Sequence, residues 1–299
     1  MQRIIVVLGL VLLLHSCEKA IKVDVPPQPA RLVLHCITAL ADSFRVSLSS
    51  SIGILQYTGQ QISVHNGTLL LYDNDVIADT FIYDSARDLY LSDKVAAPGH
   101  TYRIQANAPG FEQAEATATV PREVPVDVVV TSNARTGTDG FPMAEVRIRF
   151  RDPGGNDPDS YRIAITRRYG MDESYISGCI QVTDPSVEQL RDMDAMEKPC
   201  YTGGNMYLRD QLFNGKEKEV RLYIAHADIL PYVNPSDDTI RSVIGLEHYQ
   251  EKYFLYLKSK EYLWYNDGNP FAEPTNVQTN VKNGYGIFAI TSVSKYTVR

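Results

Sequence analysis

The chain has 299 residues, of which 44% are hydrophobic and 22% are charged, and its formal net charge is −7 at pH 7. This composition is typical of a globular protein with a sizeable core, and the length suffices for two domains. The acidic balance comes without a cluster of lysine and arginine residues, so we expect no binding of nucleic acid.

The chain begins with a short apolar leader that ends at a cysteine. The apolar run extends from Ile4 to Leu14, and His15-Ser16-Cys17 follows it. The run is long enough for the core of a secretion signal but falls short of the roughly 20 residues of a membrane-spanning helix. A small residue directly before a cysteine is the pattern of a bacterial lipoprotein signal. We therefore expect residues 1–16 to be a signal peptide and Cys17 to be acylated; an ordinary secretory signal is the alternative.

The next segment, residues 17–29, is predicted to be a tether. Val25-Pro26-Pro27-Gln28-Pro29 favours extended polyproline geometry, which makes a semi-rigid spacer. If Cys17 carries two or three acyl chains, the anchor is stable, whereas a single chain would hold the protein only marginally.

Short apolar or alternating runs then follow at regular spacing, separated by turn residues. This pattern is typical of an antiparallel sandwich, and we predict an immunoglobulin-like β-sandwich over residues 30–121. His65-Asn66-Gly67 suits either a tight hairpin or a simple loop, and Asp73-Asn74-Asp75 reads as a turn. The predicted strands are 31–38, 44–50, 68–72, 76–83, 89–91, 101–106 and 114–120.

A larger β-rich domain is predicted over residues 126–299, after a joint rich in Val-Pro pairs. Its distinctive element is a long helix at about 246–265, because Leu246, Tyr249, Tyr253 and Tyr256 are spaced by three and four residues without an intervening Gly or Pro. The fold class is therefore mainly β, with an N-terminal sandwich followed by a β-rich domain that carries one long helix.

Three cysteines remain once Cys17 is assigned to lipid. Cys179 and Cys200 lie in a polar, irregular stretch, and a disulfide between them is permitted outside the reducing cytosol. Cys36 lies within an apolar run that reads as a buried strand, where a thiol behaves as a small hydrophobic group.

Sequence motifs for catalysis are weak. The histidines lack zinc-site spacing, no Cys-x-x-Cys pair occurs, and no Gly-x-Ser-x-Gly elbow is present. Gly284-Tyr285-Gly286 reads as a turn that enters a strand, since a dinucleotide fingerprint requires a following helix. We expect no cofactor and no enzymatic activity, although a triad assembled from distant positions is not tested by motifs.

Two groups of residues are candidate contacts. Asp152, Asn156 and Asp159 form an oxygen-rich turn that could hold Ca²⁺; the alternative is that these side chains cap the turn by themselves. Trp264 and Tyr265 stand at the end of the predicted helix beside a turn, which suggests exposed contacts to a ligand or partner.

The C-terminal residues resemble a known family signature. Asn269-Pro270-Phe271-Ala272-Glu273-Pro274, followed by Asn280 to Phe288 with Asn283-Gly284 inside it, is similar to the closing signature of the Bacteroidota lipoproteins called the domain of unknown function 4249 family. This chain has Thr279 where serine is usual. The resemblance extends over nearly the whole mature chain. Asn269 and Phe271 of this signature are candidate contacts, and the alternative is that the segment is a shaped loop leading into the last strand.

This resemblance implies an outer-membrane lipoprotein that is often encoded beside a TonB-dependent transporter, and it implies no established activity or cofactor. We therefore expect a lipid-anchored, non-enzymatic accessory or ligand-capture subunit of such a β-barrel transporter, on either the cell surface or the periplasmic face. The alternative is an independent surface protein that binds glycans or peptides. An envelope hydrolase is a third possibility that no motif supports.

Overall fold

The computed structural model describes residues 29–53, 56, 59–137, 140–190, 200–230, 240–266 and 275–298. Cys17, the expected tether up to residue 28, Asn269 and Phe271 therefore lie outside the described residues. Within these limits the chain is mainly β, as the sequence predicted. No helix in the described ranges is both long enough and apolar enough to cross a membrane.

The N-terminal region, up to residue 119, consists of nine strands in the described residues. They are β1 (Leu32–Ala39), β2 (Ser43–Ser50), β3 (Ile62–Ser63), β4 (Thr68–Asp73), β5 (Val76–Thr80), β6 (Ile82–Asp84), β7 (Leu89–Val95), β8 (Thr101–Asn107) and β9 (Ala114–Thr119).

The C-terminal region contributes longer strands and the main helix. Its strands are β10 (Val126–Thr136), β11 (Pro142–Arg151), β12 (Asp159–Tyr169), β13 (Asp172–Tyr175), β14 (Ile180–Val182), β15 (Val187–Glu188), β16 (Cys200–Tyr201), β17 (Met206–Arg209), β18 (Glu217–Ala225), β19 (Ile240–Gln250), β20 (Val281–Lys282) and β21 (Tyr285–Thr297). Its helices are η2 (Asp210–Leu212), α2 (His226–Ile229) and α3 (Glu251–Asn266).

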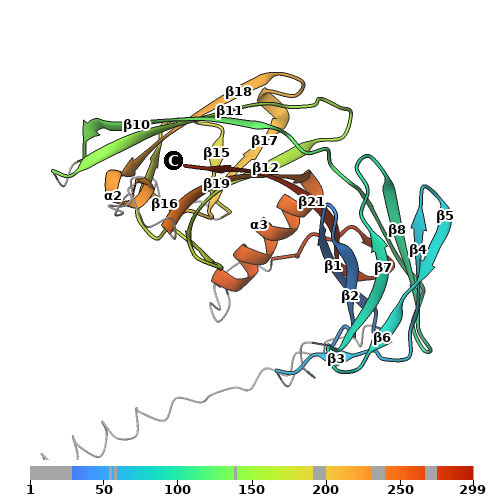
Figure 1. The fold of residues 1–299 in the computed structure, drawn as a ribbon. Coiled ribbons are helices and arrows are strands. Elements are labelled where there is room, and N and C mark those ends of the chain that lie inside the picture. Colours follow the sequence, from blue (N-terminus) through green and yellow to red (C-terminus); the bar gives the residue numbers. More distant parts are fainter. Residues whose placement is uncertain are drawn as a thin grey trace, which may run out of the picture.

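One long sheet runs through both regions. Its main strand order is β15-β17-β12-β19-β21-β1-β2-β7-β6, while β13 and β3 pair at its margins with β12 and β2. A second sheet, β20-β9-β8-β4-β5, packs against the N-terminal half of the long sheet, and a third, β10-β11-β18-β14-β16, packs against the other half. Figure 1 shows the resulting pair of sandwiches, with β21 between them.

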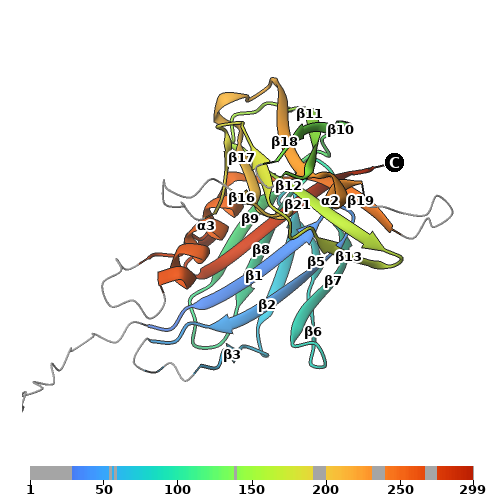
Figure 2. The ribbon, with the colours of Figure 1, turned by 90° about the vertical axis from the view of Figure 1, so that its left-hand side faces the viewer.

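Strand β21 joins the two sandwiches because it pairs on both of its edges. It is parallel to β1, with Cys36 opposite Phe288, and antiparallel to β19, with Leu246 opposite Ser294. Figure 2 shows β21 and β1 side by side along the sheet. Phe288 and Ile290 are buried in the N-terminal core. The N-terminal sandwich thus draws part of its core from the end of the chain, and its β1–β21 pair is parallel, not antiparallel as the rest of the expected sandwich is.

The predicted helix at about 246–265 begins too early, and this part of the prediction is wrong. Residues up to Gln250 belong to strand β19, and the helix α3 starts at Glu251. Strand β19 is hydrogen-bonded on both sides, to β12 and β21, and is buried on both faces. Leu246 and Tyr249 are therefore buried within the sheet and not along one face of a helix. Their three-residue spacing imitates a helical period that continues only from Tyr253 onward.

Two smaller features refine the expected N-terminal strands. The segment His65-Asn66-Gly67 is a loop between β3 and β4, which pair with different strands, so it is not a hairpin turn. Asn74 and Asp75 both have positive φ and form the tight turn of the β4–β5 hairpin. The expected strand 76–83 divides into β5 and β6 at the buried Phe81, and the two pieces join different sheets.

Cys179 and Cys200 form a disulfide with their Cα atoms 5.1 Å apart, as the sequence suggested. The bridge ties the start of β14 to β16 at the margin of the third sheet. Cys36 is free and buried, and burial raises the pKa of its thiol to about 11. Cys36 is therefore a core residue and a poor nucleophile.

Candidate functional site

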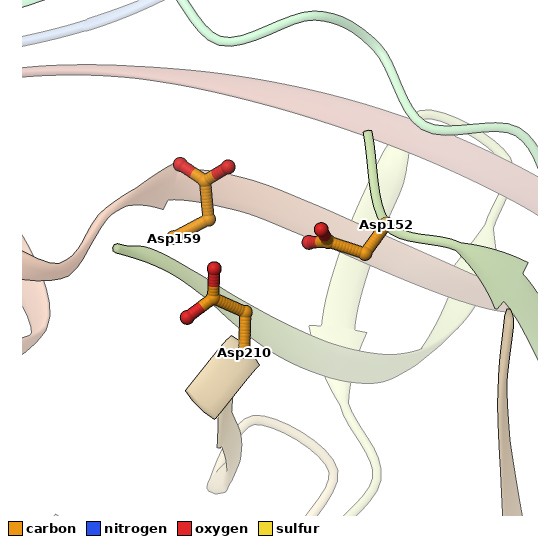
Figure 3. A group of neighbouring side chains, drawn as sticks. All are labelled: Asp152, Asp159 and Asp210. Carbon is orange, nitrogen blue, oxygen red and sulfur yellow. The ribbon is translucent and has the colours of Figure 1, made fainter. Parts of the chain in front are cut away.

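Three aspartate side chains converge in the C-terminal sandwich, next to its junction with the N-terminal one. Asp152, Asp159 and Asp210 each offer a carboxylate oxygen, and these oxygens all lie within 4.8 Å of one another. Figure 3 shows Asp152 and Asp210 each directing a carboxylate oxygen into the space between the three residues, with the carboxylate of Asp159 on the far side of that space. Asp152 and Asp210 are 1% and 2% exposed, so two of the three acids are inside the protein.

Asp152 directly follows β11 and is held by hydrogen bonds. Its Oδ1 accepts from the backbone N–H groups of Gly154 and Gly215, at 2.8 and 2.7 Å, and its Oδ2 accepts from the Tyr161 hydroxyl at 2.5 Å. Burial and this carboxylate raise the pKa of Tyr161 well above its usual range, so the hydroxyl stays a donor. Asp152 therefore fixes the loop that leads into β12.

Asp210 is the least satisfied member of the cluster. It opens the short helix η2 at the end of β17, and its Oδ2 is buried without a hydrogen-bond partner among the described residues. Burial, a partly compensating hydrogen bond from the Asp159 backbone, and the charges of Asp152, Asp159 and Glu251 combine to raise the pKa of Asp210. The carboxylate of Asp210 thus has an unused acceptor oxygen and lies beside two other acids.

His248 completes the cluster from strand β19. It is 2% exposed, its ring stacks on Tyr161 at 4.7 Å, and its Nδ1 lies 2.9 Å from the backbone carbonyl oxygen of Arg122. Because a carbonyl can only accept, Nδ1 carries a proton. Nε2 lies 3.2 Å from Oδ2 of Asp159 but is not aligned for a hydrogen bond.

The cluster opens toward a pocket of about 310 Å³ between the two sandwiches. Thr119 to Arg122 line the pocket from the N-terminal side, and the loop Pro153 to Asp157 lines it from the other. Asp159 and His248 belong to both the pocket wall and the acidic cluster. Asp159 is partly exposed, with 18% of its side chain accessible, so it forms the boundary between solvent and the buried acids.

Polar contacts hold the joint beside this pocket. The Arg122 carbonyl accepts from the hydroxyl of Ser292 at 3.0 Å in addition to His248. The Thr119 N–H donates to the side chain of Gln250 at 3.2 Å. The segment between β9 and β10 is thus attached to strands β19 and β21 by directed hydrogen bonds, which fix the shape of the pocket.

The structure brings some of the sequence-predicted residues together and separates others. Asp152 and Asp159 lie in one cluster, whereas Asn156 is exposed and lines the pocket beside it. The sequence did not predict Asp210 or His248, which come from distant segments without a metal-binding spacing. Trp264 and Tyr265 are exposed, at 72% and 60%, near the end of α3 and apart from this cluster.

A second hollow lies on the outer face of β1 and β2, with a volume of about 490 Å³. Its wall carries three serines, Ser47, Ser49 and Ser50, together with His35. Burial and the charge of Lys260 lower the pKa of His35. The hollow offers hydroxyl groups and an imidazole, which suit a polar ligand.

The glycine-rich turn near the C-terminus has a structural role. A Cβ on Gly286 would lie 2.0 Å from the carbonyl oxygen of Leu34, and one on Gly284 would lie 2.6 Å from that of Leu32. These glycines let β21 approach β1 closely. The side chain of Asn280 exchanges two hydrogen bonds with the backbone of Phe288, at 2.7 and 2.9 Å. The described part of the C-terminal signature therefore shapes the entry to β21, as expected for a turn leading into a strand.

Comparison with known proteins gives distant structural similarity. The chain is 10% identical to a Salmonella alpha-2-macroglobulin mutant (TM-score 0.30, covering 92% of this chain and 15% of that one). It is 9% identical to the BSP domain of a biofilm associated protein (TM-score 0.25, covering 95% of this chain and 62% of that one). It is also 9% identical to the RrgB pilus protein from Streptococcus pneumoniae (TM-score 0.23, covering 74% of this chain and 48% of that one).

No curated protein matches the sequence. A family model, in contrast, matches residues 18–297, which is nearly the whole chain. The chain therefore belongs to the family described as Domain of unknown function (DUF4249).

Proposed function

We propose that the protein is a lipid-anchored component of the cell envelope, held at the outer membrane through Cys17. The observation that carries this proposal is the apolar run Ile4 to Leu14, which ends three residues before the cysteine and is followed at once by polar residues. The proline-rich segment after Cys17 would then hold the folded part away from the lipid surface.

The disulfide between Cys179 and Cys200 supports a location outside the cytosol. Structural disulfides persist in oxidising compartments and are rare where thiols are kept reduced. The bridge ties a margin of the C-terminal sandwich, where the short strands β14 and β16 pair. A protein secreted through its leader would form this bridge after leaving the cytosol.

Within the envelope, we propose a non-enzymatic role as an accessory or ligand-capture subunit of a TonB-dependent β-barrel transporter. The pocket between the sandwiches supports ligand capture, since clefts at domain junctions are common binding sites. The transporter follows from the resemblance of the C-terminal signature to lipoproteins encoded beside such barrels.

Exposed apolar side chains at one margin of the N-terminal sandwich support a protein partner. Val76 and Ile77 on β5 are 70% and 58% exposed, and Ile82 on β6 is 75% exposed. Strands β5 and β6 are the last strands of their sheets. Such edges pair readily with another chain, so they are the part of the surface that we would assign to the partner.

A pull-down from gently solubilised membranes tests the accessory role. A tagged full-length protein is expected to bring down a β-barrel transporter, and a variant with Val76→Lys and Ile82→Lys is expected to lose it while Trp264→Ala retains it. Recovery of the lipoprotein alone under these conditions would count against the proposal.

An independent surface protein that binds glycans or peptides is the second candidate. The exposed Trp264 and Tyr265, together with the serine-lined hollow, favour it, because aromatic faces and hydroxyl groups are the usual contacts of sugars. Affinity electrophoresis against polysaccharides separates the two. Retardation of the wild type that is lost in Trp264→Ala would favour this candidate over the transporter subunit.

A further inference from the structure

We infer that Asp152, Asp159 and Asp210 form a binding site for a divalent cation that prefers oxygen ligands, with Ca²⁺ as the best match. The site differs from the oxygen-rich turn expected from sequence, because Asp210 of η2 replaces Asn156 as the third ligand. It is independent of the lipid anchor and of the transporter, and it adds a property to the pocket between the sandwiches.

The first argument is the geometry of the oxygens. Calcium binds oxygens at about 2.3–2.6 Å, so two oxygens on opposite sides of the ion are about 4.8 Å apart. The three carboxylate oxygens lie within 4.8 Å of one another. Three oxygens no farther apart than this leave a common point within about 2.8 Å of each, so a small movement of the side chains would let one ion contact all three. Water from the pocket would supply the remaining ligands.

The second argument is the uncompensated charge. Asp152 is offset by its three hydrogen-bond donors, whereas Asp210 has one backbone donor, at Asp159, and stands beside two other acids. A buried charge with so little compensation is costly unless a cation offsets it. The imidazole of His248 faces Asp159 at the rim, with Nε2 at 3.2 Å from Oδ2 of Asp159. The two buried acids, Asp152 and Asp210, lie behind it.

The third argument is the pair of buried polar atoms without hydrogen-bond partners. Oδ2 of Asp210 and Nε2 of His248 are both buried and unpartnered among the described residues, and both side chains are 2% exposed. Most buried polar atoms in proteins have a partner, so two such atoms in one cluster point to a ligand. Asp210 supplies the oxygen for that ligand.

His248 orients the site and does not need to bind the ion. Its Nδ1–H donates to the Arg122 carbonyl, which fixes the ring, and its Nε2 faces Asp159. Carboxylates suit Ca²⁺, whereas an imidazole ligand would favour Zn²⁺ or other transition metals. Because Arg122 lies in the joint between the sandwiches, a bound ion would stiffen that joint through Asp159 and His248.

Thermal unfolding of the detergent-purified full chain tests the site. After chelation, millimolar Ca²⁺ should raise the Tm of the wild type by at least about 3 °C, as expected for a ligand well above its Kd. Asp210→Asn should lose this rise. In chelator its Tm should equal or exceed that of the wild type, because the substitution removes repulsion without changing shape. The matched control, Asp157→Asn, alters an exposed acid of the same pocket wall and should keep the rise.

Terbium luminescence provides a second readout that does not depend on stability. Tb³⁺ substitutes for Ca²⁺, and the nearby Tyr161, which hydrogen-bonds Asp152, would sensitise its emission. We expect emission that Ca²⁺ displaces and that weakens at least about tenfold in Asp210→Asn and in the rim variant Asp159→Asn.

Three results would overturn the inference. They are an unchanged Tm of the wild type with every divalent cation, a full calcium response in Asp210→Asn, and a response to Zn²⁺ without one to Ca²⁺. The first would mean that the acids share a proton, and the third would mean that His248 is a ligand.

Discussion

The two sandwiches share a strand but bury different kinds of side chain. The N-terminal core contains apolar groups, and the buried polar residues near it are the uncharged Thr38, Ser49 and Ser92. The C-terminal sandwich has an equally apolar centre but buries Asp152, Asp210 and His248 beside it. Buried charge costs free energy, so residues of this kind are expected where a protein has a functional site. Their placement on one side of the joint therefore points to the C-terminal sandwich as the side that carries the site.

The largest effect is expected at the strand that the two sandwiches share. Phe288→Ala removes a buried ring that contacts Phe44, with ring centroids 6.1 Å apart, in the N-terminal core. The free energy of unfolding should fall by about 3–5 kcal/mol. Urea denaturation followed by circular dichroism measures it. A loss below about 1 kcal/mol would mean that the N-terminal sandwich folds without the end of the chain.

The disulfide should matter for the C-terminal sandwich. Reduction, or Cys179→Ser with Cys200→Ser, opens a loop with a sequence separation of 21 residues and should cost about 3 kcal/mol. Cys36→Ser is the control in the N-terminal core, where the cost comes from burying a hydroxyl and is insensitive to reductant. Thermal scans with and without reductant compare them; an unchanged Tm of the wild type under reduction would contradict the expected role of the bridge.

Asp152→Ala tests whether the loop before β12 depends on its carboxylate. The substitution leaves the N–H groups of Gly154 and Gly215 and the hydroxyl of Tyr161 without their acceptor, so we expect a loss of about 2–3 kcal/mol. Chemical denaturation in the presence of a chelator measures this loss of hydrogen bonds without a contribution from a bound cation. Wild-type stability would show that the hydrogen bonds are replaced by water.

A smaller, pH-dependent effect is expected at Asp184. Burial opposes its ionisation, but Lys218 at 2.7 Å and hydrogen bonds from Ser186 together hold the pKa of Asp184 below its ordinary value of 3.8. A depressed pKa stabilises the folded state above pH 3.8, and this contribution is lost as the pH falls through the folded-state value. Asp184→Asn should therefore cost about 1 kcal/mol near neutral pH, allowing for solvent screening, and nothing at the acid end.

The N-terminal counterpart of this ion pair is Asp84 with Arg87, which is exposed. A hydrogen bond from Arg87 lowers the pKa of Asp84, but solvent screens the pair, so Asp84→Asn should cost less than Asp184→Asn near neutral pH. Denaturation curves of both variants, recorded at steps of about one pH unit between roughly pH 3 and pH 7, measure the difference between their costs in unfolding free energy. Equal costs would mean that burial does not separate the two regions.

Local patterns predicted the mainly β fold, because alternation and turn residues act over a few positions. The start of α3 was missed since Leu246 and Tyr249 are buried by strands on both sides of β19, a property of the sheet that no local period records. The parallel pairing of β21 with β1 joins opposite ends of the chain, and only its glycines gave a local signal.

The acidic cluster was half predictable for the same reason. Asp152 and Asp159 are near in sequence and suggested an oxygen-rich turn, whereas Asp210 and His248 arrive from η2 and β19. Their proximity follows from strand pairing: β12 lies between β17, which leads into Asp210, and β19, which carries His248. A sequence can place such residues together only once the strand order is known.

The central claim is the lipid anchor at Cys17, and mass spectrometry of the mature amino terminus tests it most directly. For protein purified from native membranes, we expect an N-terminal peptide that starts at Cys17 and carries acyl chains, and we expect Cys17→Ala to leave the membrane fraction. An amino terminus at any other residue, or an unmodified Cys17, would contradict the account.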